Sequence, residues 1–212
     1  MEKTKKPSSL QKLMAYAGSY KVLTYSSWVL SAASALLALV PYLYIWKVIK
    51  AVLDAAPDYG SAAGLAKNGW LAAAFAVGSM LVYLCALLCS HLAAFRVQAN
   101  IRSKMMHHIV TLPMGFMDGI GSGRLRKTVN ECSAATETYL AHQLPDMVGA
   151  YVTPIGLLAL LLVFDWRLGL LSLLPVVVAF AIMGSMTGAA MKAKMAEYQN
   201  SLDTMSNEAV EY

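Results

Sequence analysis

Two apolar segments, on either side of residues 112–125, are each too long to be contained in a lipid bilayer as helices. Residues 70–112 contain no proline, and residues 124–164 contain only Pro145 and Pro154. As a continuous helix each segment would extend about 60–65 Å, whereas the hydrocarbon core of a bilayer is about 30 Å thick. We therefore expect two helices that cross a membrane, continue into water as stalks, and reverse direction there in a short glycine-containing turn.

The composition agrees with a membrane location, because 58% of the 212 residues are hydrophobic and only 14% are charged. This balance is typical of an all-α polytopic membrane protein. Four long apolar stretches predict spans at about 22–46, 70–95, 144–164 and 168–190. Residues 47–69 then form an outer loop. Residues 1–21 are expected to be a cytoplasmic tail and an amphipathic elbow helix on the inner membrane surface, with its apolar face formed by Leu10, Leu13, Met14 and Ala17.

The basic residues predict the orientation of the spans. With the N-terminus inside, the inner segments hold 13 of the 17 lysines and arginines and the outer loops hold 4. Because cytoplasmic loops are enriched in lysine and arginine, we expect the stalks, residues 96–143 and 191–212, to be cytoplasmic in the plasma membrane of a bacterium. The net charge of +5 is thus an orientation signal, and it does not indicate a nucleic-acid-binding surface.

Apolar residues at helical spacing predict that the two stalks pack against each other. On the outgoing stalk the stripe is Val97, Ile101, Met105 and Ile109. On the returning stalk it is Leu125, Val129, Cys132, Thr136, Tyr139 and Gln143.

The turn between the stalks reads Leu-Pro-Met-Gly-Phe-Met-Asp at 112–118, followed by Gly-Arg-Leu at 123–125. This pattern resembles the first intracellular loop of the exporter-type transmembrane domain of ATP-binding-cassette (ABC) transporters, which carries the first coupling helix. Asp-Trp-Arg-Leu at 165–168 is similar to the outer turn between the third and fourth spans of that family. The resemblance implies docking on a nucleotide-binding domain through Pro113, Met114, Phe116, Met117, Asp118, Gly123 and Arg124. Apolar anchors with a charged rim suit such an interface.

The family has six spans in each half, and four are expected here, so we expect an N-terminal part of a transmembrane domain, 22–212. The chain contains no G-x-x-x-x-G-K-[ST] phosphate-binding loop. We therefore expect no cofactor, metal or enzymatic activity in this chain. The resemblance implies ATP and Mg²⁺ at a nucleotide-binding domain elsewhere, ATP hydrolysis by the complete transporter, a second transporter half as homo- or heterodimer, and a small-molecule substrate.

Four polar residues near the ends of apolar stretches are candidates for a cavity or gate: His91, His142, Gln143 and Asp146. Polar groups at membrane depth are functional candidates by default, although packing or interfacial hydrogen bonding is the alternative. Tyr83 could line the same cavity. The stretch Ala141–Asp146 also resembles the equivalent stretch in a bacterial subgroup of the family that uses this fold for siderophore uptake.

Two other functions remain open on these residues. A four-span scaffold or accessory subunit would bind a soluble partner through the same turn. A membrane enzyme using His91, His142 and Asp146 is a further alternative, although these residues do not have the spacing of a metal-ligand cluster.

Overall fold

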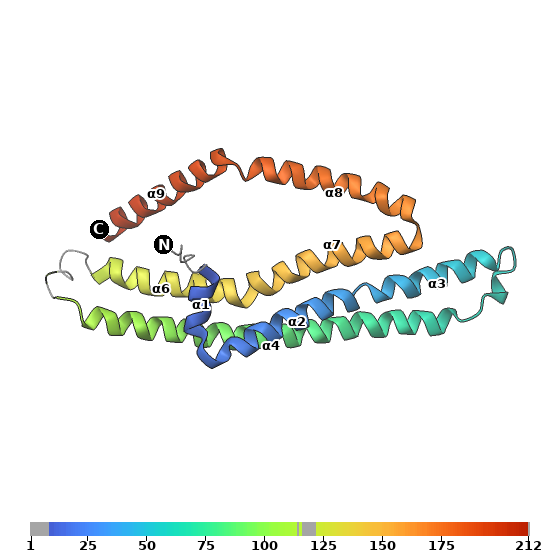
Figure 1. Ribbon diagram of the computed structural model, residues 1–212, viewed down its shortest axis with the longest axis horizontal. Coiled ribbons are helices and arrows are strands. Elements are labelled where there is room, and N and C mark those ends of the chain that lie inside the picture. The colour runs from blue at the N-terminus through green and yellow to red at the C-terminus, as the bar shows by residue number, and fades with distance from the viewer. Residues whose placement is uncertain (1–8, 114, 116–121, 212) are drawn as a thin grey trace, which may run out of the picture. The chain divides into compact units, whose positions relative to one another are not determined.

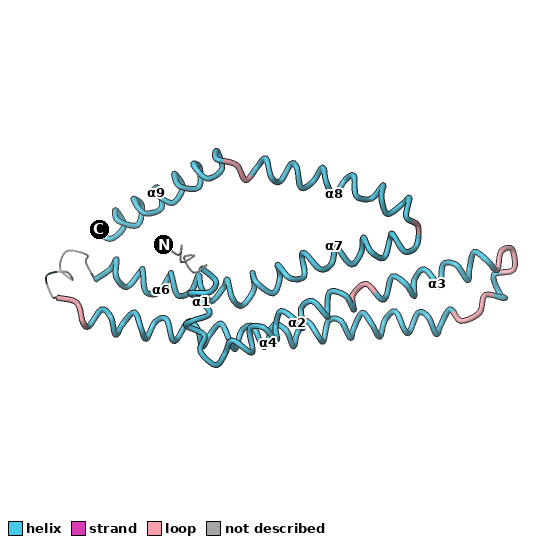
Figure 2. Tube along the Cα trace, in the orientation of Figure 1, coloured by secondary structure: helices cyan, strands magenta, loops and turns pink. Residues whose placement is uncertain are grey.

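The computed structural model describes residues 9–113, 115 and 122–211, and its regular elements are all helical (Figures 1 and 2). The chain forms two compact units, residues 1–156 and 157–212. The long helices are α1 (Ser9–Ala17), α2 (Lys21–Leu37), α3 (Val40–Asp54), α4 (Leu65–Val110), α6 (Ser122–Thr138), α7 (Leu144–Phe164), α8 (Trp166–Met186) and α9 (Ala189–Glu211). Short helical turns are η1 (Gly18–Tyr20), η2 (Tyr59–Ser61) and the π-helical turn η3 (Tyr139–Gln143).

Four helical segments in the described part of the chain are long and apolar enough to cross a membrane: Leu10–Asp54, Leu65–Val110, Leu125–Phe164 and Trp166–Met186. The predicted all-α membrane fold with four spans is therefore confirmed. The 46 residues of α4 make a helix about 69 Å long, more than twice the thickness of the hydrocarbon core. α4 thus has the length expected of a span that continues as a stalk.

The first predicted span is interrupted, and the loop after it is shorter than we expected. The helix breaks at residues 38–39, between α2 and α3, and Pro41 lies in the first turn of α3. Proline has no N–H and its ring clashes with the carbonyl four residues earlier, so the first turn of a helix accommodates it at the lowest cost. α7 and α8 nevertheless continue through internal prolines, Pro154 and Pro175. α3 then continues to Asp54, and α4 begins at Leu65, so residues 47–69 are mostly helical and only residues 55–64 connect the two helices.

The second unit contains the end of α7 together with α8 and α9. Asp165 caps α8, because its carboxylate accepts hydrogen bonds from the backbone N–H groups of Arg167 (2.8 Å) and Leu168 (3.4 Å). Gly169 allows the turn to close: a Cβ there would lie 3.0 Å from the Cα of Leu162 and 2.7 Å from its Cδ2. α8 ends at Met186, and Thr187 and Gly188 form the turn that leads into α9. The fourth span was expected to continue to residue 190.

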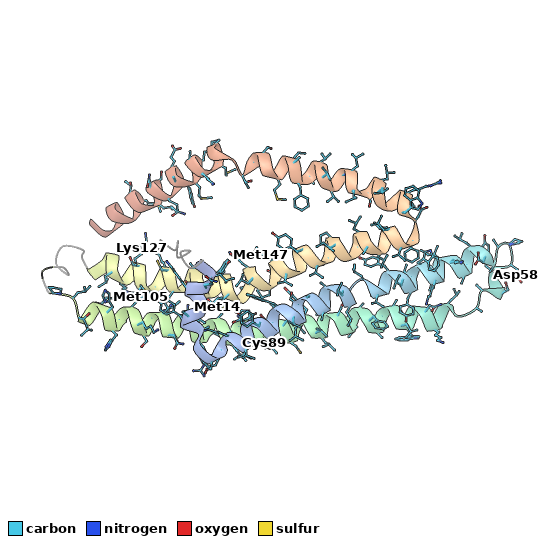
Figure 3. The ribbon with its side chains drawn as sticks, viewed as in Figure 1. Met14, Asp58, Cys89, Met105, Lys127 and Met147 are labelled. Atoms are coloured by element: carbon cyan, nitrogen blue, oxygen red, sulfur yellow. The ribbon has the colours of Figure 1, made fainter. Side chains whose placement is uncertain are left out.

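The core of the first unit lies where α1 crosses α4 (Figure 1). Met14 and Ala17 of α1 are 6% and 0% exposed, and Met14 is labelled at this crossing in Figure 3. They pack with buried residues of α4, η3 and α7, namely Ala94, Val97, Leu140, Ala141 and Leu144. Met14 and Ala17 on the apolar face of α1 are therefore covered by protein, whereas Leu10 and Leu13 on the same face remain half-buried.

The two stalks pack along the predicted stripe on α4 but along a corrected stripe on α6. Val97 is buried and Ile101, Met105 and Ile109 are half-buried, as expected. On the returning stalk Val129, Ser133 and Leu140 are buried, whereas the predicted Cys132 and Gln143 are exposed. The side chain of Ser133 accepts a 2.7 Å hydrogen bond from Nε of Arg102 and so joins the stalks. The π-helical turn adds a residue to one turn of the helix, which shifts the face presented beyond Thr138.

Candidate functional site

The junction between the returning stalk and the third apolar helix is a π-helical turn. In η3 the N–H of Leu144 bonds to the carbonyl of Tyr139, five residues earlier. Pro145 follows directly and has no N–H to offer to the carbonyl of Ala141, its partner in a regular helix. Single π-turns inside α-helices often occur at functional sites. The sequence contained the proline, but it did not reveal the change of helix type.

Serine hydroxyls from two neighbouring helices supply bonds at this junction. Ser90 of α4 donates to the carbonyl of Ala141 (2.8 Å), and its hydroxyl is also 2.9 Å from the carbonyl of Leu87. Ser31 of α2 donates to the carbonyl of Pro145 (2.8 Å). Ser90, Ala141 and Ser31 are 1%, 0% and 2% exposed, so no water reaches these bonds. Buried hydroxyls therefore hold the start of α7 against α2 and α4.

We expect Ser90→Ala to destabilise the protein by about 1–3 kcal/mol, because a buried carbonyl at Ala141 would lose its hydroxyl donor. The measurement is thermal unfolding of the purified protein in detergent. Ser172→Ala is the matched control, since the hydroxyl of Ser172 bonds only within its own helix, to the carbonyl of Gly169 (2.8 Å), and its loss should cost under about 0.5 kcal/mol. Equal effects of the two substitutions would contradict a special role for Ser90.

Next to this junction the structure joins two of the predicted polar residues to partners on α4. The hydroxyl of Tyr83 donates to Oδ1 of Asp146 at 2.8 Å. The ring of His91 lies edge-on to the ring of His142, with 4.6 Å between centroids and 81° between planes. The two pairs connect the same helices, α4 with the segment formed by η3 and α7. His142 and Asp146, four residues apart on the same helical segment, thus each contact a residue of α4.

These polar side chains are partly or fully exposed in the structure, although the helices that carry them are apolar. Asp146, His142 and Gln143 are exposed, and His91 and Tyr83 are half-buried. Gln143 is not drawn into either pair in the described part of the chain. The arrangement offers a carboxylate, a phenol, two imidazoles and an amide, which can bind a hydrogen-bonding ligand. In the described residues, no group of three or more His, Cys, Asp or Glu side chains is placed to hold a metal ion.

Three of the predicted coupling residues, Pro113, Gly123 and Arg124, are described by the structure, where α4 ends and α6 begins. α4 ends at Val110, and Pro113 follows as an exposed residue of the turn. Gly123 and Arg124 lie in the first turn of α6, where a Cβ on Gly123 would meet no atom within 4 Å. Met114, Phe116, Met117 and Asp118 lie outside the described residues. The described ends of the turn thus agree with a reversal at the distal end of two long helices.

Sequence reasoning missed the polar seam of α2. Thr24, Ser27, Ser31 and Ser34 are all buried, and Ser34 donates to the carbonyl of Ser79 on α4 (2.8 Å). Their spacing of three and four residues is the signal that could have revealed them, because small hydroxyl residues let membrane helices approach closely and bond across the interface. The hydropathy of this segment predicts a span, but it does not show that one face is lined by hydroxyl groups.

Four helical segments in the described residues that are long and apolar enough to cross a membrane indicate a multi-pass membrane protein. Comparison with known families gives the class: residues 15–211 match the ABC transporter transmembrane region. The chain belongs to this family and is a transmembrane domain of an ABC transporter. This assignment favours the transporter over the four-span scaffold.

Three curated relatives carry the same name, mycobactin import ATP-binding/permease protein IrtA. The Mycolicibacterium smegmatis protein is 31% identical over 122 residues, which are 58% of this chain and 14% of that protein. The Mycobacterium tuberculosis protein is 34% identical over 97 residues, 46% of this chain and 11% of that protein. The Mycolicibacterium thermoresistibile protein is 28% identical over 165 residues, 76% of this chain and 17% of that protein. The chain therefore spans less than a fifth of the length of these relatives.

Proposed function

We propose that this chain forms part of the translocation path of an ATP-driven transporter, and that its 113–124 turn couples the path to a nucleotide-binding domain. The observation that carries the proposal is the length of α4, about 69 Å, which takes the turn well beyond any membrane position of its apolar part. Within the residues that the structure describes, the stalks are joined by Val129, Ser133 and Arg102, so they can move as one body. ATP and Mg²⁺ would bind to the nucleotide-binding domain, outside this chain.

The second part of the proposal is that Asp146, His142, His91 and Gln143 face a cavity that substrate enters. Exposed ionisable groups in a membrane-spanning helix are costly against lipid and normally face a water-filled space or another protein segment. The bonds of the neighbouring carbonyls to Ser90 and Ser31 fix the helix that carries these groups. A second transporter half, identical or different, would complete the cavity.

The named activity of the relatives supports a substrate class and a direction. All three are mycobactin importers by name, and the stretch Ala141–Asp146 had already resembled a siderophore-uptake subgroup. We therefore propose uptake of mycobactin or a molecule of similar chemistry across the plasma membrane of a bacterium. The basic residues support an orientation with the N-terminus and the stalks in the cytoplasm.

Inverted proteoliposomes with the complete transporter test both substrate and direction. Mycobactin should stimulate ATP hydrolysis, and ATP added outside should lower the amount of labelled mycobactin inside the vesicles, because import then runs outward. Omission of Mg²⁺ is the control for ATP-driven movement. Accumulation inside the vesicles would overturn import, and absence of stimulation by mycobactin would overturn the substrate class.

The proposed cavity role predicts that Asp146→Asn raises the half-maximal substrate concentration for ATPase stimulation about tenfold, equivalent to about 1.4 kcal/mol. The substitution keeps the size of the side chain but removes the charge and weakens the bond with Tyr83. Asp54→Asn, at the exposed end of α3, is the control and should leave that concentration within twofold. An unchanged concentration in Asp146→Asn would favour a packing role for the cluster.

A further inference from the structure

A groove of about 440 Å³ lies between α1 and the stalk part of α4. Three of the residues that line it, Leu13, Ile101 and Met105, are apolar and half-buried. Met105 is labelled on α4 in Figure 3. The ring of Tyr16 forms part of the wall. The groove therefore offers a surface for a few methylene groups, bordered by side chains that can bind a polar group.

The charges around the groove have one sign. Lys12 and Lys104 line it, together with His108. Residues 9–21 and 91–111, which build both sides, contain five lysines and arginines and no aspartate or glutamate. Nζ of Lys104 lies 4.7 Å from the centroid of the Tyr16 ring, whereas Lys12 makes no ion pair with any described residue. Two ammonium groups at an apolar groove without a carboxylate attract an anion.

The groove lies just beyond the apolar parts of α2 and α4, where we expect the surface of the membrane. Val22 begins the apolar part of α2, five residues after the end of α1, and Arg96 is the first charge after the apolar part of α4. Ile101 and Lys104 follow Arg96 by about one and a half to two helical turns. Lysine side chains can extend back toward the headgroup region while their methylene stems cover apolar surface. Anionic headgroups of the inner leaflet attract basic clusters in this position.

We propose that the groove binds an anionic phospholipid of the inner leaflet, with the headgroup phosphate between Lys12 and Lys104. The glycerol and the first methylene groups of the lipid cover Leu13 and Ile101. The bound lipid thereby ties α1 to the stalk, next to the hydrogen bond that the side chain of Asn100 donates to the carbonyl of Tyr16 (3.1 Å). The location in the inner leaflet rests on the orientation under Proposed function, but the binding chemistry does not depend on transport.

The experiment uses the complete transporter in detergent and measures its unfolding temperature with added dioleoyl-phosphatidylglycerol or dioleoyl-phosphatidylcholine. Phosphatidylglycerol should raise the unfolding temperature of the wild type by several degrees more than phosphatidylcholine. Lys12→Gln/Lys104→Gln should lose at least half of this difference. The control, Lys47→Gln/Lys50→Gln, should keep it, because these lysines also lie over aromatic rings (5.0 and 5.3 Å from Tyr44 and Trp46) but at the other end of the helices.

Two further measurements separate binding from a folding defect. Lys12→Arg/Lys104→Arg retains both charges and should retain the difference between the lipids, and native mass spectrometry should count fewer retained phosphatidylglycerol molecules on the glutamine variant than on the wild type. The proposal is overturned if the glutamine variant keeps the full wild-type difference and lipid count. It is also overturned if inorganic phosphate stabilises the wild type as much as phosphatidylglycerol does. None of these readouts measures transport, so failure here is distinguishable from failure of the proposed function.

Discussion

Phe116→Asp in the complete transporter is expected to reduce substrate-stimulated ATP hydrolysis at least tenfold while ATP still binds. A carboxylate placed among the apolar anchors of the turn would have to lose its hydration at the interface, and truncation or disruption of a central anchor typically costs 2 kcal/mol or more. The measurement compares ATPase rates with and without substrate in proteoliposomes. Binding of a fluorescent ATP analogue shows whether the nucleotide-binding domain is still intact.

Tyr59→Asp is the matched control for this substitution. Tyr59 is an exposed aromatic residue (63%) in the turn between α3 and α4, at the opposite end of the long helices (Figure 1). An aspartate there alters no part of the proposed coupling surface, so stimulated hydrolysis should remain within twofold of the wild type. If substrate stimulates ATP hydrolysis by Phe116→Asp as much as by the wild type, the turn does not couple substrate binding to hydrolysis, and the coupling proposal fails.

Leu140→Ala is expected to destabilise the protein by about 2–5 kcal/mol, the largest effect that we predict on folding. Leu140 lies in the π-helical turn, is 1% exposed, and packs in the cluster that joins α1, α4 and α7. Truncation leaves a cavity where three helical segments meet. Because these segments are packed against one another, they cannot easily move to fill the cavity. The measurement is thermal unfolding in detergent, with the wild type at the same protein concentration.

A leucine of the second unit supplies the comparison for Leu140. Leu174 on α8 is 63% exposed, so Leu174→Ala removes the same atoms without opening a cavity within its own unit and should cost under about 1 kcal/mol. If the two variants unfold at the same temperature, the cluster around Leu140 is not the packing centre of the first unit.

The long helices could be predicted from sequence because their determinants are local. In α4 no proline interrupts the run, and its stripe of Val97, Ile101, Met105 and Ile109 repeats every four residues. Hydrophobicity, helical period and the absence of breakers act within a few residues, so they can be recognised without the tertiary structure. The break before Pro41 agrees with the helix-breaking character of proline, but α7 and α8 continue through Pro154 and Pro175, so the sequence alone does not decide which proline interrupts a helix.

The details of the returning stalk were not predictable in this way. A strict helical period from Val129 selected Cys132, although its neighbour Ser133 is the buried residue. It also selected Gln143, but the π-helical turn rotates the residues beyond Thr138 and buries Leu140 instead. The α1 stripe gave a similar result: its apolar pattern showed that one face would be covered, but not whether lipid or protein would cover it. Small residues at Ala94 and Ala17 allow the helix contact that buries one part of this face, and Leu10 and Leu13 stay partly buried.

The sequence by itself determined that this chain is an all-helical membrane protein with four apolar spans, and its motifs pointed to the ABC transporter family. These properties depend on hydrophobicity, period and short motifs, which are written locally along the chain. Only the tertiary structure paired Tyr83 with Asp146 and His91 with His142, and only it directed Ser90 and Ser31 to the carbonyls around Pro145. Such pairings depend on the rotation of each helix about its axis, which is decided by packing between residues distant in sequence.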